Sequence, residues 1–144
     1  MPFINVKVNI PLTEEKRIAV KTALGKSIEA MGKSEDYLMV GFEENVPLYF
    51  AGEKEEKCAF VDVRVFGEVD PKQADDMTKL ICQTLEMVLG IPASKTYVTY
   101  QGFTDWGWNG KNFLGAKMAF QVWPLTIVSG SCVCFINREK EKDR

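Results

Sequence analysis

The sequence opens on the stretch PFINVKVN, from Pro2 to Asn9, in which apolar and polar side chains alternate. This period of two predicts a β-strand with Ile4, Val6 and Val8 on one side. We expect the initiator methionine to be removed before a residue as small as proline. The mature chain would then begin with a secondary amine held rigidly at the end of a strand, which is a candidate general base.

The composition strengthens this interpretation, because the chain contains no histidine. Histidine is the usual side chain for proton transfer near neutral pH, so few other groups in this chain could serve as the base in place of the Pro2 amine. The alternative is that Pro2 is only a tolerated residue at the start of a strand. Pro2 alone does not decide between the two, since single-residue motifs are weak.

The overall composition is that of an ordinary soluble globular protein, with 46% hydrophobic residues, 26% charged residues and a net charge of -2. A chain of 144 residues predicts one domain. No basic excess points to nucleic acid as a partner. The first residues lack a charged segment followed by an apolar one, so we expect no secretory signal and a cytoplasmic protein.

The cysteines are few and scattered: Cys58, Cys82, Cys132 and Cys134. They predict no disulfide framework, which fits the reducing cytosol. Because the chain has no histidine and no Cys-x-x-Cys pair, we expect no zinc or other metal site.

The strand is followed by the signals of a helix. Thr13 is a plausible N-cap, and the apolar residues that follow recur at helical spacing: Val20, Leu24, Ile28 and Met31. Gly32 predicts the end of this helix. A second strand is predicted over 37–43, then a short extended piece over 48–50 and a polar loop over 51–56.

The second half repeats this order. A strand is predicted over 58–66, and Asp70 and Pro71 mark an N-cap with proline at the first helical position. The predicted helix has an apolar stripe of six residues: Met77, Leu80, Ile81, Thr84, Leu85 and Val88. Gly90 ends the helix, and the fourth strand is predicted over 96–101.

Two strand-helix-strand units predict an α/β (α+β) fold, in which a four-stranded mixed sheet carries both helices on one face. The other face mixes Asn5 and Lys7 with Phe60, Asp62 and Arg64, so it is neither a dry core nor a fully polar surface. Such a face suits an oligomer whose sheets surround a polar channel. A monomeric two-layer sandwich with an open polar face is the alternative.

Several stretches, in this order and close to this spacing, resemble the macrophage migration inhibitory factor and D-dopachrome tautomerase family: Met1-Pro2, Gly32-Lys33, Tyr37, Phe50-Ala51-Gly52, Cys58-Ala59, Phe66-Gly67, Tyr97 and Trp106-Gly107-Trp108-Asn109-Gly110-Lys111-Asn112-Phe113. The resemblance covers residues 1–113. It implies a tautomerase domain over 1–113, a symmetric homotrimer, and active sites at the subunit interfaces.

The resemblance also implies roles for individual residues. Pro2 is the catalytic base, and Lys33 faces the carboxylate of a small keto or enol acid. The backbone of Phe66 lies next to the substrate, and Tyr97 comes from the neighbouring subunit. Thr99 stands where the family often has asparagine, which shortens the reach of that side chain.

The remaining implied substrate-binding residues are aromatic: Tyr37, Trp106, Trp108 and Phe113. The implied reaction is the keto-enol tautomerisation of arylpyruvates or dopachrome-like compounds. It needs a base that is neutral at working pH, and apolar walls with a nearby lysine would both lower the pKa of an amine. The reaction requires no metal and no organic cofactor.

A second function from the resemblance is signalling as a secreted, cytokine-like trimer that binds a cell-surface receptor, with an incidental pocket. That function would require export without a signal peptide. A thiol-oxidoreductase activity attributed to some relatives is not expected, because Cys58 is followed by Ala59, Phe60 and Val61 instead of a second nearby cysteine.

The C-terminal extension over 114–144 has no counterpart in the family. Residues 118–136 contain no charged residue, which allows a membrane anchor, although this run is only moderately apolar. Extra strands packed on the trimer and a loosely ordered tail are the alternatives. Contact with a membrane is expected only if this run is an anchor.

Overall fold

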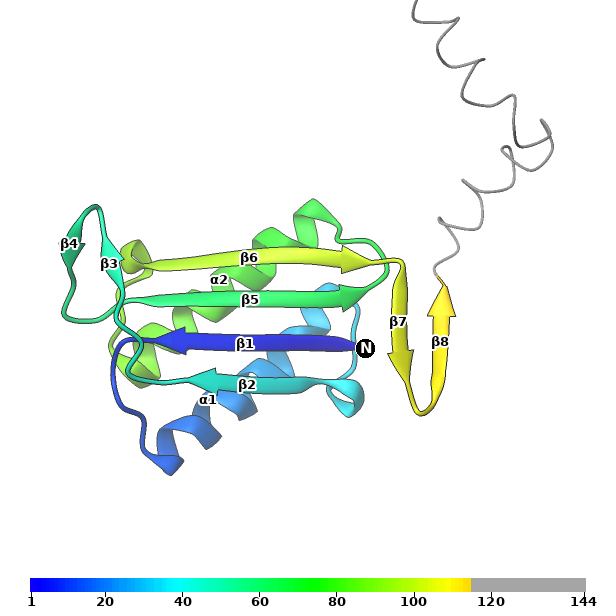
Figure 1. The fold of residues 1–144 in the computed structure, drawn as a ribbon, viewed down its shortest axis with the longest axis horizontal. Coiled ribbons are helices and arrows are strands. Elements are labelled where there is room, and N and C mark those ends of the chain that lie inside the picture. The colour runs from blue at the N-terminus through cyan, green and yellow to red at the C-terminus, as the bar shows by residue number, and fades with distance from the viewer. Residues whose placement is uncertain (115–144) are drawn as a thin grey trace, which may run out of the picture. The chain divides into compact units, whose positions relative to one another are not determined.

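A computed structural model describes residues 1–114 of the chain. The chain divides into two compact units, the first from Met1 to Phe103 and the second beginning at Thr104. The first unit holds the main sheet and both helices (Figure 1).

The main sheet has four strands in the order β2-β1-β5-β6. Strand β1 (Pro2–Val8) is parallel to β2 (Met39–Glu43), and β5 (Ala59–Phe66) is parallel to β6 (Thr96–Phe103). The two pairs join through β1 and β5, which are antiparallel. Figure 1 shows both helices on the same face of this sheet. The predicted mixed sheet with two helices on one face is therefore confirmed.

Helix α1 spans Glu14–Ser27 and begins as the sequence predicts, because the Thr13 hydroxyl accepts the N–H of Lys16 at 3.2 Å. Its last turn tightens into a 3-10 helix, Ile28–Met31, before Gly32 ends it with a φ of 68°. The predicted single helix to Met31 is thus an α-helix followed by a 3-10 turn, and a left-handed glycine closes both.

Helix α2 spans Pro71–Leu89, with Pro71 in its first turn and the Asp70 carboxylate accepting the N–H of Gln73 at 3.0 Å. Gly90 closes it with a φ of 69°. Both ends match the sequence signals, because the cap chemistry is local.

The core lies between the sheet and the two helices. Alternate residues of the central strands are fully buried: Ile4, Val6, Val8, Val61, Val63 and Val65. They pack against the buried stripes of the helices: Val20, Leu24, Ile28, Met77, Ile81 and Leu85. Each such side chain contributes roughly 1.5–3 kcal/mol by leaving water, so this alternation fixes which face of each strand turns towards the helices.

Two stretches differ from their predicted structure. The second strand begins at Met39 and not at residue 37, because Glu35–Tyr37 forms a 3-10 turn that the Ser34 hydroxyl caps. The predicted loop over 51–56 contains β4 (Glu53–Lys54), which pairs with β3 (Tyr49–Phe50). The two-residue connection has φ values of 53° and 81°, as a tight hairpin turn requires.

The described part of the second unit is a hairpin of β7 (Asp105–Trp108) and β8 (Lys111–Leu114). Its turn residues Asn109 and Gly110 both have positive φ, which suits a two-residue hairpin turn. The sequence analysis used these residues only as a family motif and did not predict the two strands.

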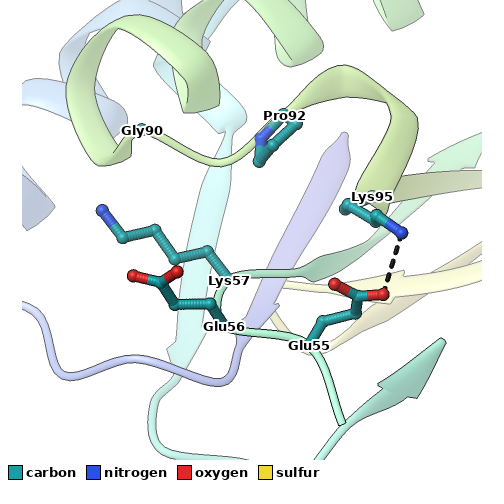
Figure 2. Close-up of a pocket in the computed structure, with 6 residues that line it drawn as sticks. All are labelled: Glu55, Glu56, Lys57, Gly90, Pro92 and Lys95. Atoms are coloured by element: carbon teal, nitrogen blue, oxygen red, sulfur yellow. Dashed lines mark hydrogen bonds and ion pairs between the residues drawn. The ribbon is translucent and has the colours of Figure 1, made fainter. Parts of the chain in front are cut away.

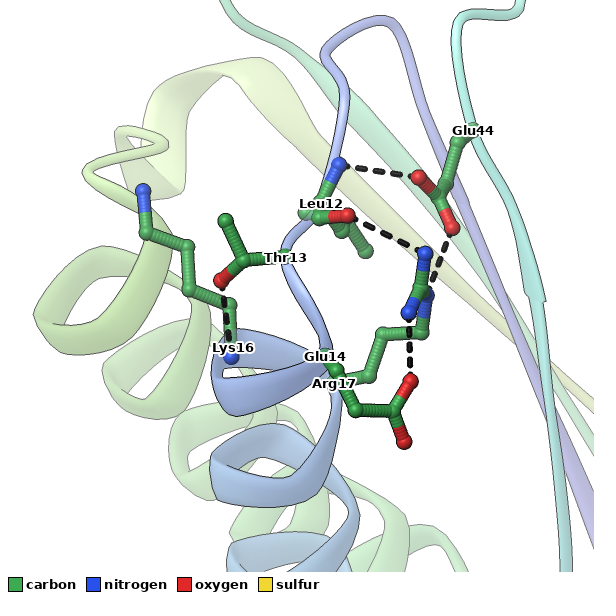
Figure 3. Close-up of polar contacts among 6 residues, drawn as sticks. All are labelled: Leu12, Thr13, Glu14, Lys16, Arg17 and Glu44. Carbon is green, nitrogen blue, oxygen red and sulfur yellow. Dashed lines mark hydrogen bonds and ion pairs between the residues drawn. The ribbon is translucent and has the colours of Figure 1, made fainter.

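A polar cluster ties α1 to the end of β2 (Figure 3). One oxygen of Glu44 accepts the N–H of Leu12 at 2.9 Å, and the other accepts the Nε of Arg17 at 2.7 Å. Arg17 also donates to the Leu12 carbonyl at 3.1 Å and to Glu14 at 2.6 Å. The cluster holds the chain between β1 and α1 in place.

Within residues 1–114, no helix is both long and apolar enough to cross a membrane. The uncharged run over 118–136, with Cys132 and Cys134, lies outside the described residues. The expectations for the extension over 114–144, and the domain boundary after Phe113, stay predictions.

Candidate active site

The start of β1 lies at one end of the sheet, where Pro2 is buried. Pro2 pairs with Val65 of β5, and Val65 pairs with Gly102 of β6. The strand that carries Pro2 is central in the sheet, between β2 and β5. Neighbours on both sides therefore hold the N-terminal strand rigidly.

Lys33 and the start of the chain meet at the backbone of Phe66. The Nζ of Lys33 donates to the Phe66 carbonyl at 2.9 Å, and the Phe66 N–H donates to the Met1 carbonyl at 3.2 Å. Lys33 reaches this position because it directly follows Gly32, whose left-handed conformation turns the chain out of the helix. Three of the predicted site residues, Pro2, Lys33 and Phe66, are thus brought together.

The terminal amine in this corner has a lowered pKa. Partial burial of the Met1 amine is the larger cause, and the positive charge of Lys33 is the second. Both effects favour the neutral amine, which is the form that can accept a proton.

Tyr37 lies at the same end of the sheet. It ends the 3-10 turn two residues before Met39, and Met39 pairs with Phe3 next to Pro2. The Tyr37 side chain is 56% exposed.

A single chain does not bring Tyr97 and Thr99 to Pro2. Both lie on β6 before Gly102, the residue level with Pro2, so their positions are displaced by about 17 Å and about 10 Å along the strand. Tyr97 is 60% exposed on the face of the sheet away from the helices. These two residues can approach a Pro2 only in another copy of the chain.

Thr99 has a partner that the sequence analysis missed. Its hydroxyl donates to Asp62 at 3.3 Å, and the same carboxylate accepts the Nε of Arg64 at 3.0 Å. Strand alternation places Asp62 and Arg64 on one face, but nothing in the sequence pairs β5 with β6 in a particular register. Because the Thr99 hydroxyl donates to Asp62, its hydrogen is already engaged within the chain.

Trp106, Trp108 and Phe113 belong to the β7–β8 hairpin, where Trp106 pairs with Phe113. This hairpin is part of the second unit, so the predicted place of these three residues in a substrate pocket stays a prediction.

A cavity of about 310 Å³ lies at the end of α2 (Figure 2). Charged residues and a helix-end turn line it: Glu55, Glu56, Lys57, Gly90, Pro92 and Lys95. Figure 2 shows Lys95 paired with Glu55, at 2.8 Å. No residue predicted for the site lines this cavity.

The two described thiols, Cys58 and Cys82, both have a raised pKa. Burial is the larger cause of the raised pKa of Cys58, and Glu55 adds to it; burial and then Glu86 raise the pKa of Cys82. Within residues 1–114, no group of three acidic or cysteine side chains is placed to hold a metal ion. The expected lack of metal, cofactor and thiol-oxidoreductase activity stays a prediction.

The duplicated β-α-β sheet, with a buried proline opening its central strand, defines a protein of the tautomerase fold. The solved structure described as native fused 4-OT has a TM-score of 0.68 to this chain, and at 14% identity it supports the fold alone.

Closer relatives identify the family. The sequence profile of macrophage migration inhibitory factor (MIF) matches residues 1–114. The MIF of Xenopus laevis is 25% identical over 115 residues, covering 78% of this chain and 99% of that protein. The crystal structure of Leishmania major MIF2 is 36% identical, covers 78% of this chain and 97% of that one, and has a TM-score of 0.74. A MIF homologue from Prochlorococcus marinus is 30% identical over 77% of this chain and 98% of that one, with a TM-score of 0.69.

The chain therefore belongs to the macrophage migration inhibitory factor family. The resemblance noted in the sequence is confirmed.

Proposed function

We propose that the protein is a tautomerase that interconverts the enol and keto forms of arylpyruvates or dopachrome-like compounds, with the amine of Pro2 as the base. Removal of Met1 would leave this amine in the corner described for the chain terminus. One observation supports the proposal most directly: the Phe66 carbonyl accepts a hydrogen bond from Lys33, and the Phe66 N–H donates one to Met1 at the start of the chain.

The chemistry follows from these groups. In the enol-to-keto direction the neutral amine takes the proton from the enol hydroxyl and becomes an ammonium. The ammonium then gives a proton to the enol carbon next to the one that carries the oxygen, as the carbonyl forms. The amine ends the reaction neutral, so atoms and charge balance. A base of this kind works best when its pKa lies near the working pH, and both partial burial and Lys33 lower the pKa of a terminal amine here.

Lys33 has two roles in this proposal: it binds the substrate, and it lowers the pKa of the base. Its ammonium is a donor for the substrate carboxylate, and its present acceptor is a single backbone carbonyl at 2.9 Å. Removal of Met1 also takes away the carbonyl that now accepts the Phe66 N–H, and the substrate carboxylate would be a replacement acceptor at this position. A charge-assisted contact beside a backbone donor suits a carboxylate.

We propose further that the active form is a homotrimer. Within one chain, Tyr97 and Thr99 are displaced from Pro2 by about 17 Å and about 10 Å along the sheet. A neighbouring copy can supply both side chains to the site. The exposed face of the sheet carries Phe3, Phe60 and Tyr97 among its polar groups, which suits contact with another copy.

The test is enol-keto tautomerisation of hydroxyphenylpyruvate by the full-length protein, with removal of Met1 confirmed by mass spectrometry. Turnover that falls at least a hundredfold in Pro2→Gly, in a protein of unchanged oligomeric state, would support the proposal. Equal turnover by the two proteins would contradict the proposal that the reaction depends on the secondary amine of Pro2.

The signalling function remains the alternative. If receptor binding survives Pro2→Gly while turnover is lost, the two functions use different parts of the molecule.

A further inference from the structure

Tyr97 does not stand alone on the open face of the sheet. Its ring lies 5.4 Å, centroid to centroid, from the ring of Phe50, at an interplanar angle of 42°. Such a tilted aromatic pair is a favourable arrangement. Phe50 comes from β3, far from β6 in the sequence, so this contact joins two separate elements of the first unit.

Phe50 is in turn held by a charged side chain. The Nζ of Lys95 lies 4.7 Å from the centre of the Phe50 ring, a cation-π distance. The same ammonium pairs with Glu55 at 2.8 Å, and the side chains of Lys95 and Glu55 are only 30% and 25% exposed (Figure 2). Lys95 therefore touches both Phe50 and the segment that follows its hairpin.

The β3–β4 hairpin depends on these contacts for its position. Each of its strands has two residues, which is too short for independent stability. Asn9 fixes the segment after it, because its side chain donates to the Glu55 carbonyl at 2.9 Å and accepts the Cys58 N–H at 2.8 Å. A ring carried by an otherwise weak hairpin is thus anchored at a defined place.

We propose that Phe50, held by Lys95, is a positioning residue for Tyr97. Tyr97 is 60% exposed near the start of an edge strand, so its ring is free to take several rotamers unless a neighbour restrains it. Phe50 restrains it from one side. This proposal rests on the proposed function, in which Tyr97 enters the active site of a neighbouring copy.

The proposal predicts a change in substrate binding more than in chemistry. Phe50→Ala should raise KM and lower kcat/KM by roughly threefold to tenfold, the effect expected from losing one aromatic contact. Phe50→Tyr keeps the ring and should restore most of the activity. Lys95→Met keeps the aliphatic stem and removes the charge, so its loss should be smaller, about twofold.

A double-mutant cycle separates positioning from general damage. In a Tyr97→Ala background, Phe50→Ala should cause no further loss, because the residue that it positions is gone. Tyr49→Ala is the matched control, since Tyr49 lies on the same strand of the hairpin and is 69% exposed. It should leave KM unchanged. Equal losses from Phe50→Ala in both backgrounds would overturn the proposal.

The same experiments distinguish failure of the two proposals. If turnover is lost in Pro2→Gly and the effects of Phe50→Ala and Tyr97→Ala are additive, only the proposed positioning role of Phe50 is refuted. Full turnover in Pro2→Gly would remove the proposed function. A readout independent of turnover is the ¹⁹F resonance of fluorotyrosine at Tyr97, which should move in Phe50→Ala and Lys95→Met and stay in place in Tyr49→Ala. An unmoved resonance in Phe50→Ala would overturn the positioning role.

Discussion

The ammonium of Lys33 lies 2.9 Å from the carbonyl oxygen of Phe66. The backbone N–H of Phe66 in turn donates to the carbonyl of Met1 at 3.2 Å. The backbone of a single residue, Phe66, thus links the Lys33 ammonium to the carbonyl of Met1. In the proposed function, Lys33 both binds the substrate carboxylate and lowers the pKa of the base.

Lys33→Met should lower kcat/KM roughly tenfold to a hundredfold, because it removes a charged hydrogen bond to the substrate. It should also raise the pKa of the Pro2 amine, since the positive charge of Lys33 is one cause of the lowered pKa of the Met1 amine at this end of the chain. A higher pKa leaves less neutral base at a given pH, so the acidic limb of the kcat/KM profile moves to higher pH. The profile is measured between pH 5 and pH 9 with hydroxyphenylpyruvate.

Lys33→Arg is the control for this prediction, because it keeps the charge while altering the shape. Its acidic limb should lie close to that of the wild type. An acidic limb that does not move in Lys33→Met would contradict the electrostatic role.

The contribution of a neighbouring subunit is tested by mixing two inactive variants. Pro2→Gly replaces the rigid secondary amine by a flexible primary amine and Tyr97→Ala lacks the ring, so each homo-oligomer should be impaired. Random reassembly of equal amounts should place an intact Pro2 beside an intact Tyr97 in about a quarter of the sites. Recovered activity is measured after refolding the two variants together. If the two residues acted within one chain, mixing would recover nothing.

The stability of the first unit should depend strongly on Gly102. A Cβ atom at this position would lie 2.2 Å from the backbone carbonyl oxygen of Gly67, which cannot move without disturbing β6. Gly102→Ala should therefore lower the free energy of unfolding by about 1–3 kcal/mol. Denaturant unfolding followed by circular dichroism measures the change.

Gly41→Ala provides the comparison, because the nearest atom to its added Cβ is the Asn5 side-chain oxygen at 3.0 Å. That side chain can shift, so the loss should be smaller. Equal losses in both variants would mean that the approach of Gly67 is not what requires glycine at 102.

The cluster of Arg17 and Glu44 predicts a pH-dependent contribution to stability (Figure 3). The hydrogen bond from Arg17 is the first cause of the lowered pKa of Glu44, and the Leu12 N–H is the second. A carboxyl whose folded pKa is lowered stabilises the protein above its unfolded pKa, and loses this effect as the pH falls through the folded value. Glu44→Gln should lower Tm at pH 7, and its difference from the wild type should shrink towards pH 3.

Glu14→Gln tests whether this behaviour is specific, since Glu14 also contacts Arg17 but its side chain is 73% exposed. Its effect on Tm should be smaller. A Glu44→Gln difference that stays constant from pH 7 to pH 3 would contradict the prediction.

Much of the fold could be predicted because its signals are local. The alternation of Ile4, Val6 and Val8 matches their burial, and the caps at Thr13 and Asp70 use side chains three residues from their partners. The shift from α-helix to 3-10 turn after Ser27 has no such signal.

The site could be predicted only in part, and for the same reason. The resemblance selected Lys33 and Phe66, and the structure brings their polar groups to 2.9 Å. The contacts of Phe50 with Tyr97 and of Thr99 with Asp62 join segments far apart in the sequence. Such contacts depend on the register between strands, which alternation within one strand does not determine.

The most direct test of the account compares two forms of the full-length protein, one with Met1 removed and one that keeps a blocking residue before Pro2. Both should have the same fold, but only the first has a free secondary amine at Pro2. We predict that hydroxyphenylpyruvate tautomerisation is confined to the processed form and is lost in its Pro2→Gly variant. Equal turnover by the processed and blocked forms would contradict the claim that Pro2 is the base.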